Sequence, residues 1–252
     1  KAVVFGIGLL EAAIGRPETF EWAKQLDDEP AHRVGAMHLR RMACAMQGDA
    51  AGAARYGREA ELLALRSKVA AMLEPAWAIE YLASALARDI AGLERMIAGL
   101  TPLVRRYPGW TPQLRLAQGK LQLLCGDAVR ARQLFEEACR LSAPTDPTGL
   151  KESWINASAG LCAALTELGL YREAMATAQR GLEVCAQREV ELSQHRLVLA
   201  LALAEAKHGS CAAAAERVPR IMPVQLAPGV MGPFLSATYH VRARTAAAAR
   251  DQ

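Results

Sequence analysis

Residues 119–138 read GKLQLLCGDAVRARQLFEEA, and this stretch decides the fold. Gly126 can end a helix in a left-handed backbone conformation at little cost, and Asp127 is placed to accept hydrogen bonds from the free N–H groups of a second helix. A turn this short makes the two helices antiparallel. The stretch therefore predicts a helical hairpin around Gly126-Asp127.

The same turn signal recurs along the chain at intervals of 33 to 43 residues. Its occurrences are Gly15-Arg16-Pro17, Gly48-Asp49, a weaker Arg88-Asp89, Gly126-Asp127, Gly169-Leu170-Tyr171 and Gly209-Ser210. A period in this range is typical of helical-hairpin repeats. We expect an all-α fold, a right-handed α–α superhelix of about six hairpins followed by a C-terminal helix over about 233–249.

Small residues recur at fixed distances from these turns, counted from the first residue of each turn. Five residues after the turn stand Ala53, Ala131, Ala174 and Ala214, twelve after it Ala60, Ala138 and Gly181, and seven before it Gly8, Gly119, Cys162 and Ala202. Small side chains at equivalent places let neighbouring helix backbones approach closely. The pattern therefore predicts that the hairpins stack in register.

These residues resemble the tetratricopeptide repeat, most clearly in Gly119, Gly126-Asp127, Ala131, Phe135, Ala138 and Pro144, and again in Gly169 with residues 171–174. The units exceed the usual length of about 34 residues, and Asp27 occupies a position that should be small. Longer units of this sort resemble the helical arrays of MalT-like bacterial regulators. The resemblance implies an interaction or regulatory module of a cytoplasmic bacterial protein.

Composition supports helix and excludes several functions. Alanine, the best helix former, supplies 51 of the 252 residues. The net charge of +4 is spread along the chain without a lysine-rich or arginine-rich block, so we expect no direct binding of nucleic acid. The longest stretch without a full charge, 221–241, holds three prolines and two glycines, so we expect no membrane span.

The chain is expected to form a single repeat domain over residues 1–252. It begins at Lys1 with neither an initiator methionine nor the layout of a signal peptide, and helical periodicity starts at once. We therefore expect a fragment of a larger cytoplasmic protein.

No catalytic, cofactor-binding or metal-binding residues are predicted. Gly6-Ile7-Gly8 lacks the third glycine and the preceding strand of a nucleotide-binding loop. The five histidines share no close spacing with carboxylates, and the six cysteines contain no zinc-type pair, so we expect the cysteines to be buried small residues. The sequence predicts that the chain is not an enzyme.

The candidate binding surface lies on the first helix of each hairpin. These first helices line the concave side of a right-handed hairpin solenoid. Residues thirteen, ten and six before each turn share this face. The candidate binding residues are Phe5, Leu9, His38, Met42, Leu82, Gln113, Leu116, Lys120, Asn156, Arg196 and Leu199. Two interpretations stay open: the largely apolar face is a groove for a partner, or it is covered by the curvature of the array or by another domain.

Two functions follow from these interpretations. The first is a scaffold that binds a protein or peptide, or another domain of the parent chain, on the concave face within a larger regulatory or signalling protein. The alternative is the effector-sensing array of a MalT-like transcriptional regulator, which would bind a small molecule in the same place.

Overall fold

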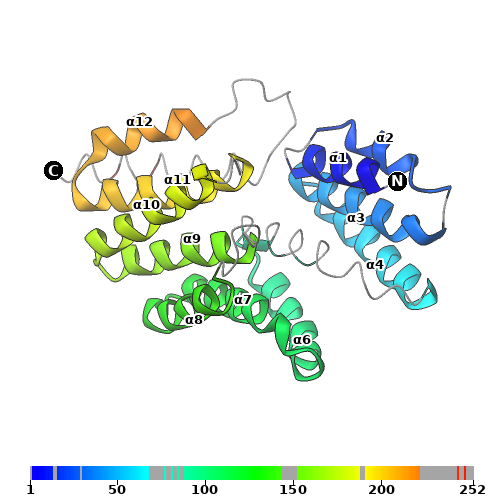
Figure 1. Ribbon diagram of the computed structural model, residues 1–252, viewed down its shortest axis with the longest axis horizontal. Helices are drawn as coiled ribbons and strands as arrows, with labels where there is room; N and C mark the ends of the chain where they lie inside the picture. The colour runs from blue at the N-terminus through cyan, green and yellow to red at the C-terminus, as the bar shows by residue number, and fades with distance from the viewer. Residues whose placement is uncertain are drawn as a thin grey trace. The chain divides into compact units, whose positions relative to one another are not determined.

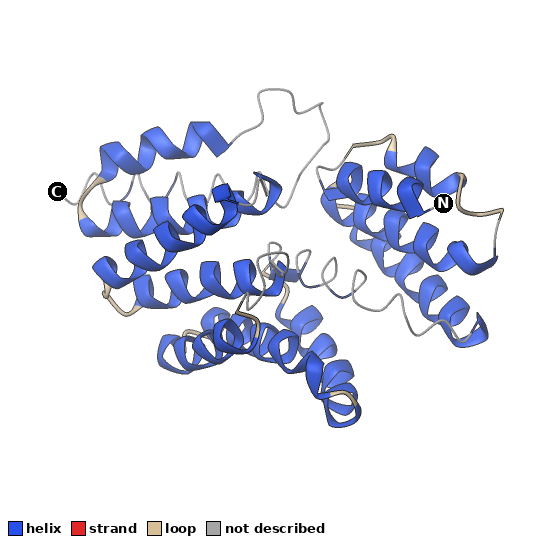
Figure 2. Ribbon diagram, in the orientation of Figure 1, coloured by secondary structure: helices blue, strands red, loops and turns tan. Residues whose placement is uncertain are grey.

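The computed structural model describes residues 2–13, 16–28, 30–67, 88–143, 152–187 and 191–221, together with Trp77, Tyr81, Ser84, Ala85 and the isolated positions 243 and 247. Within this part of the chain every regular element is a helix, as Figure 2 shows. The all-α prediction is therefore confirmed. The described helices fall into two compact units, one within residues 2–67 and the other within residues 88–221; the single domain over residues 1–252 stays a prediction.

The first unit holds α1 (Ala2–Ala13), α2 (Thr19–Lys24), α3 (Pro30–Met46) and α4 (Ala50–Ser67) (Figure 1). α3 packs against the other three helices. Buried side chains of α3 form one core with the neighbouring segments. In this core, Leu39 and Met46 of α3 lie with Leu26, which follows α2, and with Ala60 of α4. This unit therefore contains the first two predicted hairpins, with α3 at its centre.

The second unit holds α6 (Ile90–Arg106), the 3-10 turn η2 (Pro108–Trp110), α7 (Thr111–Leu124), α8 (Ala128–Leu141), α9 (Glu152–Glu167), α10 (Tyr171–Gln187), α11 (Glu191–His208) and α12 (Cys211–Ile221) (Figure 1). Each helix from α6 to α12 packs against the next one in chain order. α7 also contacts α9, and α9 contacts α11. The first helices of successive hairpins are therefore direct neighbours, as a solenoid requires.

Four turns have the predicted left-handed glycine, and three have an aspartate that caps the following helix; Gly15 of the first predicted turn lies outside the described residues. Gly48, Gly126, Gly169 and Gly209 have φ angles of 80°, 88°, 76° and 103°, in the region that favours glycine. At the weaker turn Arg88 adopts a φ of 56°, a conformation that is uncommon for a residue with a side chain. The carboxylates of Asp49, Asp89 and Asp127 each accept a hydrogen bond from the backbone N–H three residues on, at 2.8 to 2.9 Å.

Neighbouring helices approach closely at Gly119, one of the predicted small positions, and at Gly160, which the pattern did not include. Gly119 of α7 and Gly160 of α9 both lie against the buried ring of Phe135 on α8. A methyl group added to Gly160 would lie 2.4 Å from Phe135 Cε1, and one added to Gly119 would lie 2.9 Å from it. One aromatic ring therefore fills the space that glycines leave on the helices to either side.

Pro219 predicts from the sequence that the last second helix ends at about Val218, and this prediction is wrong, because α12 continues to Ile221. Proline has no N–H to donate to the carbonyl four residues before it, so α12 passes through Pro219 without that one hydrogen bond. The predicted C-terminal helix over 233–249, apart from the isolated positions 243 and 247, and most of the third hairpin's first helix lie outside the described residues.

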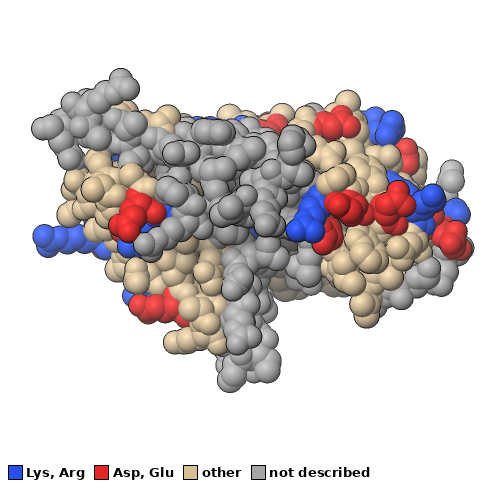
Figure 3. Space-filling model, turned by 90° about the horizontal axis from the view of Figure 1, so that it is seen from above, with Lys and Arg blue, Asp and Glu red and all other residues tan. Residues whose placement is uncertain are grey.

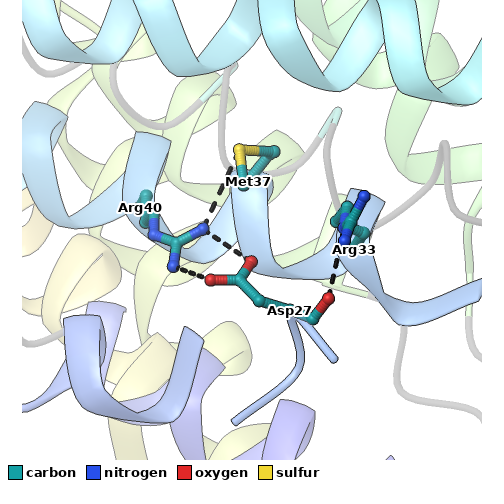
Figure 4. A network of polar contacts seen from close by, with 4 residues as sticks. All are labelled: Asp27, Arg33, Met37 and Arg40. Atoms are coloured by element: carbon teal, nitrogen blue, oxygen red, sulfur yellow. Dashed lines mark hydrogen bonds and ion pairs between the residues drawn. The ribbon is translucent and has the colours of Figure 1, made fainter. Parts of the chain in front are cut away.

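Asp27 departs from the small-residue pattern because it forms an ion pair. Its carboxylate accepts hydrogen bonds from both terminal nitrogens of Arg40 on α3, one of them at 2.9 Å, as Figure 4 shows. Its backbone carbonyl accepts a further bond from Arg33 Nε at 3.1 Å. The Arg40 hydrogen bond holds the pKa of Asp27 below its ordinary value. The pair therefore links the segment that follows α2 to α3.

We predict that Gly160→Val destabilises the protein by about 1–3 kcal/mol, because the buried Phe135 ring has no room to retreat. Gly99→Ala on α6 is the matched control, since nothing lies within 4 Å of an added methyl group there. That change should stabilise the protein by about 0.5–1 kcal/mol. Urea unfolding of both variants measures the difference, and equal effects would contradict the close packing at Gly160.

Candidate functional site

The predicted binding residues of the first unit contribute to its core. Phe5 and Leu9 of α1 are partly buried and pack, with Met42 of α3, in the cluster around Leu39. His38 is also buried. Leu82 lies outside the described residues. These apolar side chains therefore stabilise the packing of α1 on α3.

The predicted residues of the second unit lie on three neighbouring first helices: Gln113, Leu116 and Lys120 on α7, Asn156 on α9, and Arg196 and Leu199 on α11. Leu116 has no exposed surface, and Gln113, Asn156 and Leu199 are buried. Lys120 and Arg196 keep accessible surface. Of these six predicted residues, Lys120 and Arg196 are therefore the ones whose side chains can reach a partner.

The structure brings Asn156 and Arg196 together across 40 residues of sequence. Both stand thirteen residues before their turns. Arg196 Nη1 donates a hydrogen bond to Asn156 Oδ1, which joins α11 to α9. The sequence predicts that residues at the same distance from their turns share a face, and here two such residues contact each other directly.

Lys120 is a partly buried cation that lies near a second cation. Burial, and after it the charge of Arg88, lowers the pKa of Lys120 from its ordinary 10.5 to about 8. Within the described residues Lys120 makes no hydrogen bond or ion pair. The sequence identified Lys120 but missed Arg88, because only the tertiary structure brings the turn residue close to α7.

The buried polar atoms of the first helices that have no hydrogen-bond partner among the described residues include Nδ1 of His38 in the first unit and Oε1 of Gln113 in the second. Buried polar atoms are ordinarily hydrogen-bonded. Burial and the nearby Arg41 charge lower the pKa of His38 to about 4. His38 is therefore neutral at pH 7.

The described residues contain no group of His, Cys, Asp and Glu side chains that could hold a metal ion. The six cysteines are all free thiols, but Cys125 is exposed, whereas the sequence led us to expect buried cysteines. Cys125 lies between the end of α7 at Leu124 and the turn glycine Gly126. No described helix combines the length and the apolar character needed to cross a membrane.

Charged side chains of both signs are mixed on the face drawn in Figure 3. Lys and Arg side chains lie beside Asp and Glu side chains, and among the described residues drawn there neither sign forms one continuous patch.

No protein-family model matches the chain, and no curated protein or solved structure matches it either. The tetratricopeptide resemblance therefore stays a prediction that rests on the residues quoted above.

We predict that stability falls by about 3 kcal/mol as the pH drops from about 6.5 to about 4, because unfolded His38 binds a proton in this range and folded His38 does not. His38→Leu should abolish this fall. Urea unfolding across the pH range measures it.

Asp27 provides the control, since its lowered pKa makes its contribution disappear only below about 4, the unfolded value. Asp27→Asn should therefore leave the fall between pH 6.5 and pH 4 in place. A His38→Leu variant that keeps the same fall would show that His38 is not its source.

Proposed function

We propose that the chain is an interaction module, part of a larger regulatory or signalling protein, that binds an acidic protein or peptide segment on the first-helix face of its second unit. The proposal is supported by the stacked hairpins and by the chemistry of α7, α9 and α11. Helical-hairpin arrays commonly use such a face for binding.

The observation that carries the proposal is the state of Lys120. Removing a lysine from water beside another cation disfavours its charged form, so Lys120 lowers the stability of the protein at pH 7. No carboxylate pairs with it within the described residues. Groups kept in an unfavourable electrostatic environment concentrate at functional sites. A carboxylate on a partner would offset both the burial and the repulsion from Arg88.

Arg196 extends the same chemistry along the face. It keeps accessible surface on α11, while Asn156 orients its guanidinium from α9. A segment that crosses α7, α9 and α11 would therefore meet two separated cations. Acidic side chains at intervals along an extended peptide complement such an arrangement.

Selection of random peptides on the immobilised chain tests this function. We predict enrichment of Asp and Glu in the selected peptides, and binding about tenfold weaker to Lys120→Met, which removes the charge and keeps much of the side-chain length. Arg95→Met is the matched control, because Arg95 is an exposed cation on α6, a second helix. Peptides without acidic residues, or equal loss in both variants, would refute the proposal.

The effector-sensing alternative is favoured by the unpartnered atoms of His38 and Gln113. A small polar molecule that hydrogen-bonds either atom would stabilise the folded state by mass action. A thermal-shift screen of polar metabolites should then find a compound whose stabilisation disappears in His38→Leu or Gln113→Leu. A screen in which every stabilising compound acts equally on both variants would argue against this function.

A further inference from the structure

The outer face of α1 is apolar and exposed. Within α1, Glu11 is the one charged residue, and the sequence is otherwise AVVFGIGLL followed by alanines. Val3 is 73% exposed, Ile7 is also exposed, and nothing lies within 4 Å of a methyl group placed on Gly6. Residues three and four apart share a helix face, so Val3, Gly6 and Ile7 form one surface, here called the α1 outer face.

The same positions are covered in the other first helices. Val3 stands twelve residues before the first turn. The equivalent residues of α3, α7, α9 and α11 are all buried, with at most 6% of their surface exposed: Ala36, Leu114, Ala157 and Leu197. Exposure at this position is therefore peculiar to α1 among the described first helices.

The structure shows what covers these positions: the second helix of the preceding hairpin. Leu197 of α11 lies against α10, where a methyl group added to Gly181 would be 2.8 Å from its side chain. Leu201, the equivalent of Ile7, packs in a cluster with Ala174 and Ala178 of α10.

The position of Gly6 has its own counterpart in α9. Gly160 stands nine residues before its turn, as Gly6 does, and Phe135 of the preceding α8 fills the space beside it. All three residues of the α1 outer face thus occupy positions that elsewhere receive the preceding second helix.

We propose that the α1 outer face is a stacking surface for the second helix of a further hairpin of the same array, which packs on α1 as α10 packs on α11. Val3 and Ile7 are branched side chains that fit between small residues, as Leu197 and Leu201 fit against the glycine and alanines of α10. The occupant is therefore a helix with a seam of alanine and glycine spaced three or four residues apart. This inference is independent of the function proposed for the second unit.

Two fusions test the proposal on the full chain. In one, a second copy of residues 152–187 (α9 and α10) is joined ahead of Ala2 by a flexible linker; in the other, a copy of residues 111–141 (α7 and α8) takes that place. Val3→Cys is introduced in each, and maleimide labelling is followed peptide by peptide by mass spectrometry. The high effective concentration lets the added hairpin find its register.

We expect Val3→Cys to label rapidly in the chain alone and at least about tenfold more slowly in a fusion. Gly6→Leu should restore rapid labelling, because the leucine fills the space that the incoming helix needs. Gly99→Leu is the matched control and should not restore it, since Gly99 has equally open surroundings on α6. Val129→Cys, on an exposed residue of α8, should label equally fast throughout.

Unchanged labelling of Val3→Cys in both fusions overturns the proposal. Slow labelling in the chain alone that becomes fast on dilution also overturns it, since the face would then be covered by a second copy of the chain. Sedimentation of the unfused chain at the same concentrations identifies that second case by a concentration-dependent rise in mass.

Discussion

The fold depends on the close approach of helices at glycine and alanine. Phe135 occupies the space left by Gly119 on one side and Gly160 on the other, and Leu197 fits against Gly181 in the next layer. Each contact needs a residue without a large side chain at a fixed distance from the turn. Helix packing therefore depends on local turn geometry, because the left-handed turns at Gly126 and Gly169 set the register at which the helices meet.

Because this packing buries most apolar residues predicted for the first-helix face, a few polar side chains determine what the face can bind. Leucines expected to line a groove, Leu116 and Leu199, are buried. Lys120 and Arg196 remain accessible, and their cost in stability differs: Arg196 has a hydrogen-bond partner in Asn156, whereas Lys120 lies near Arg88. Binding by this face would therefore rest on charge at separated points more than on apolar area.

The sequence predicted the turns well and the contacts within the candidate site poorly. Gly126-Asp127 specifies a helix end and a helix start within two residues, and local chemistry of this kind does not depend on the rest of the fold. Asp27 was recognised as an exception but not explained, because its partner Arg40 belongs to the next hairpin. Likewise, equal register placed Asn156 and Arg196 on one face, but their hydrogen bond depends on the distance between α9 and α11.

By itself, the sequence determined the helical fold class and the positions of the described turns, since glycine and capping residues act through their immediate neighbours. Tertiary structure alone decided which members of the first-helix face are buried and which cations lie close together. Burial and pKa depend on residues brought near by folding, as Arg88 is to Lys120. Tertiary structure also decided that Val3 is exposed, whereas the residues at the equivalent position of the other described first helices are buried. The sequence did not distinguish Val3 from these residues.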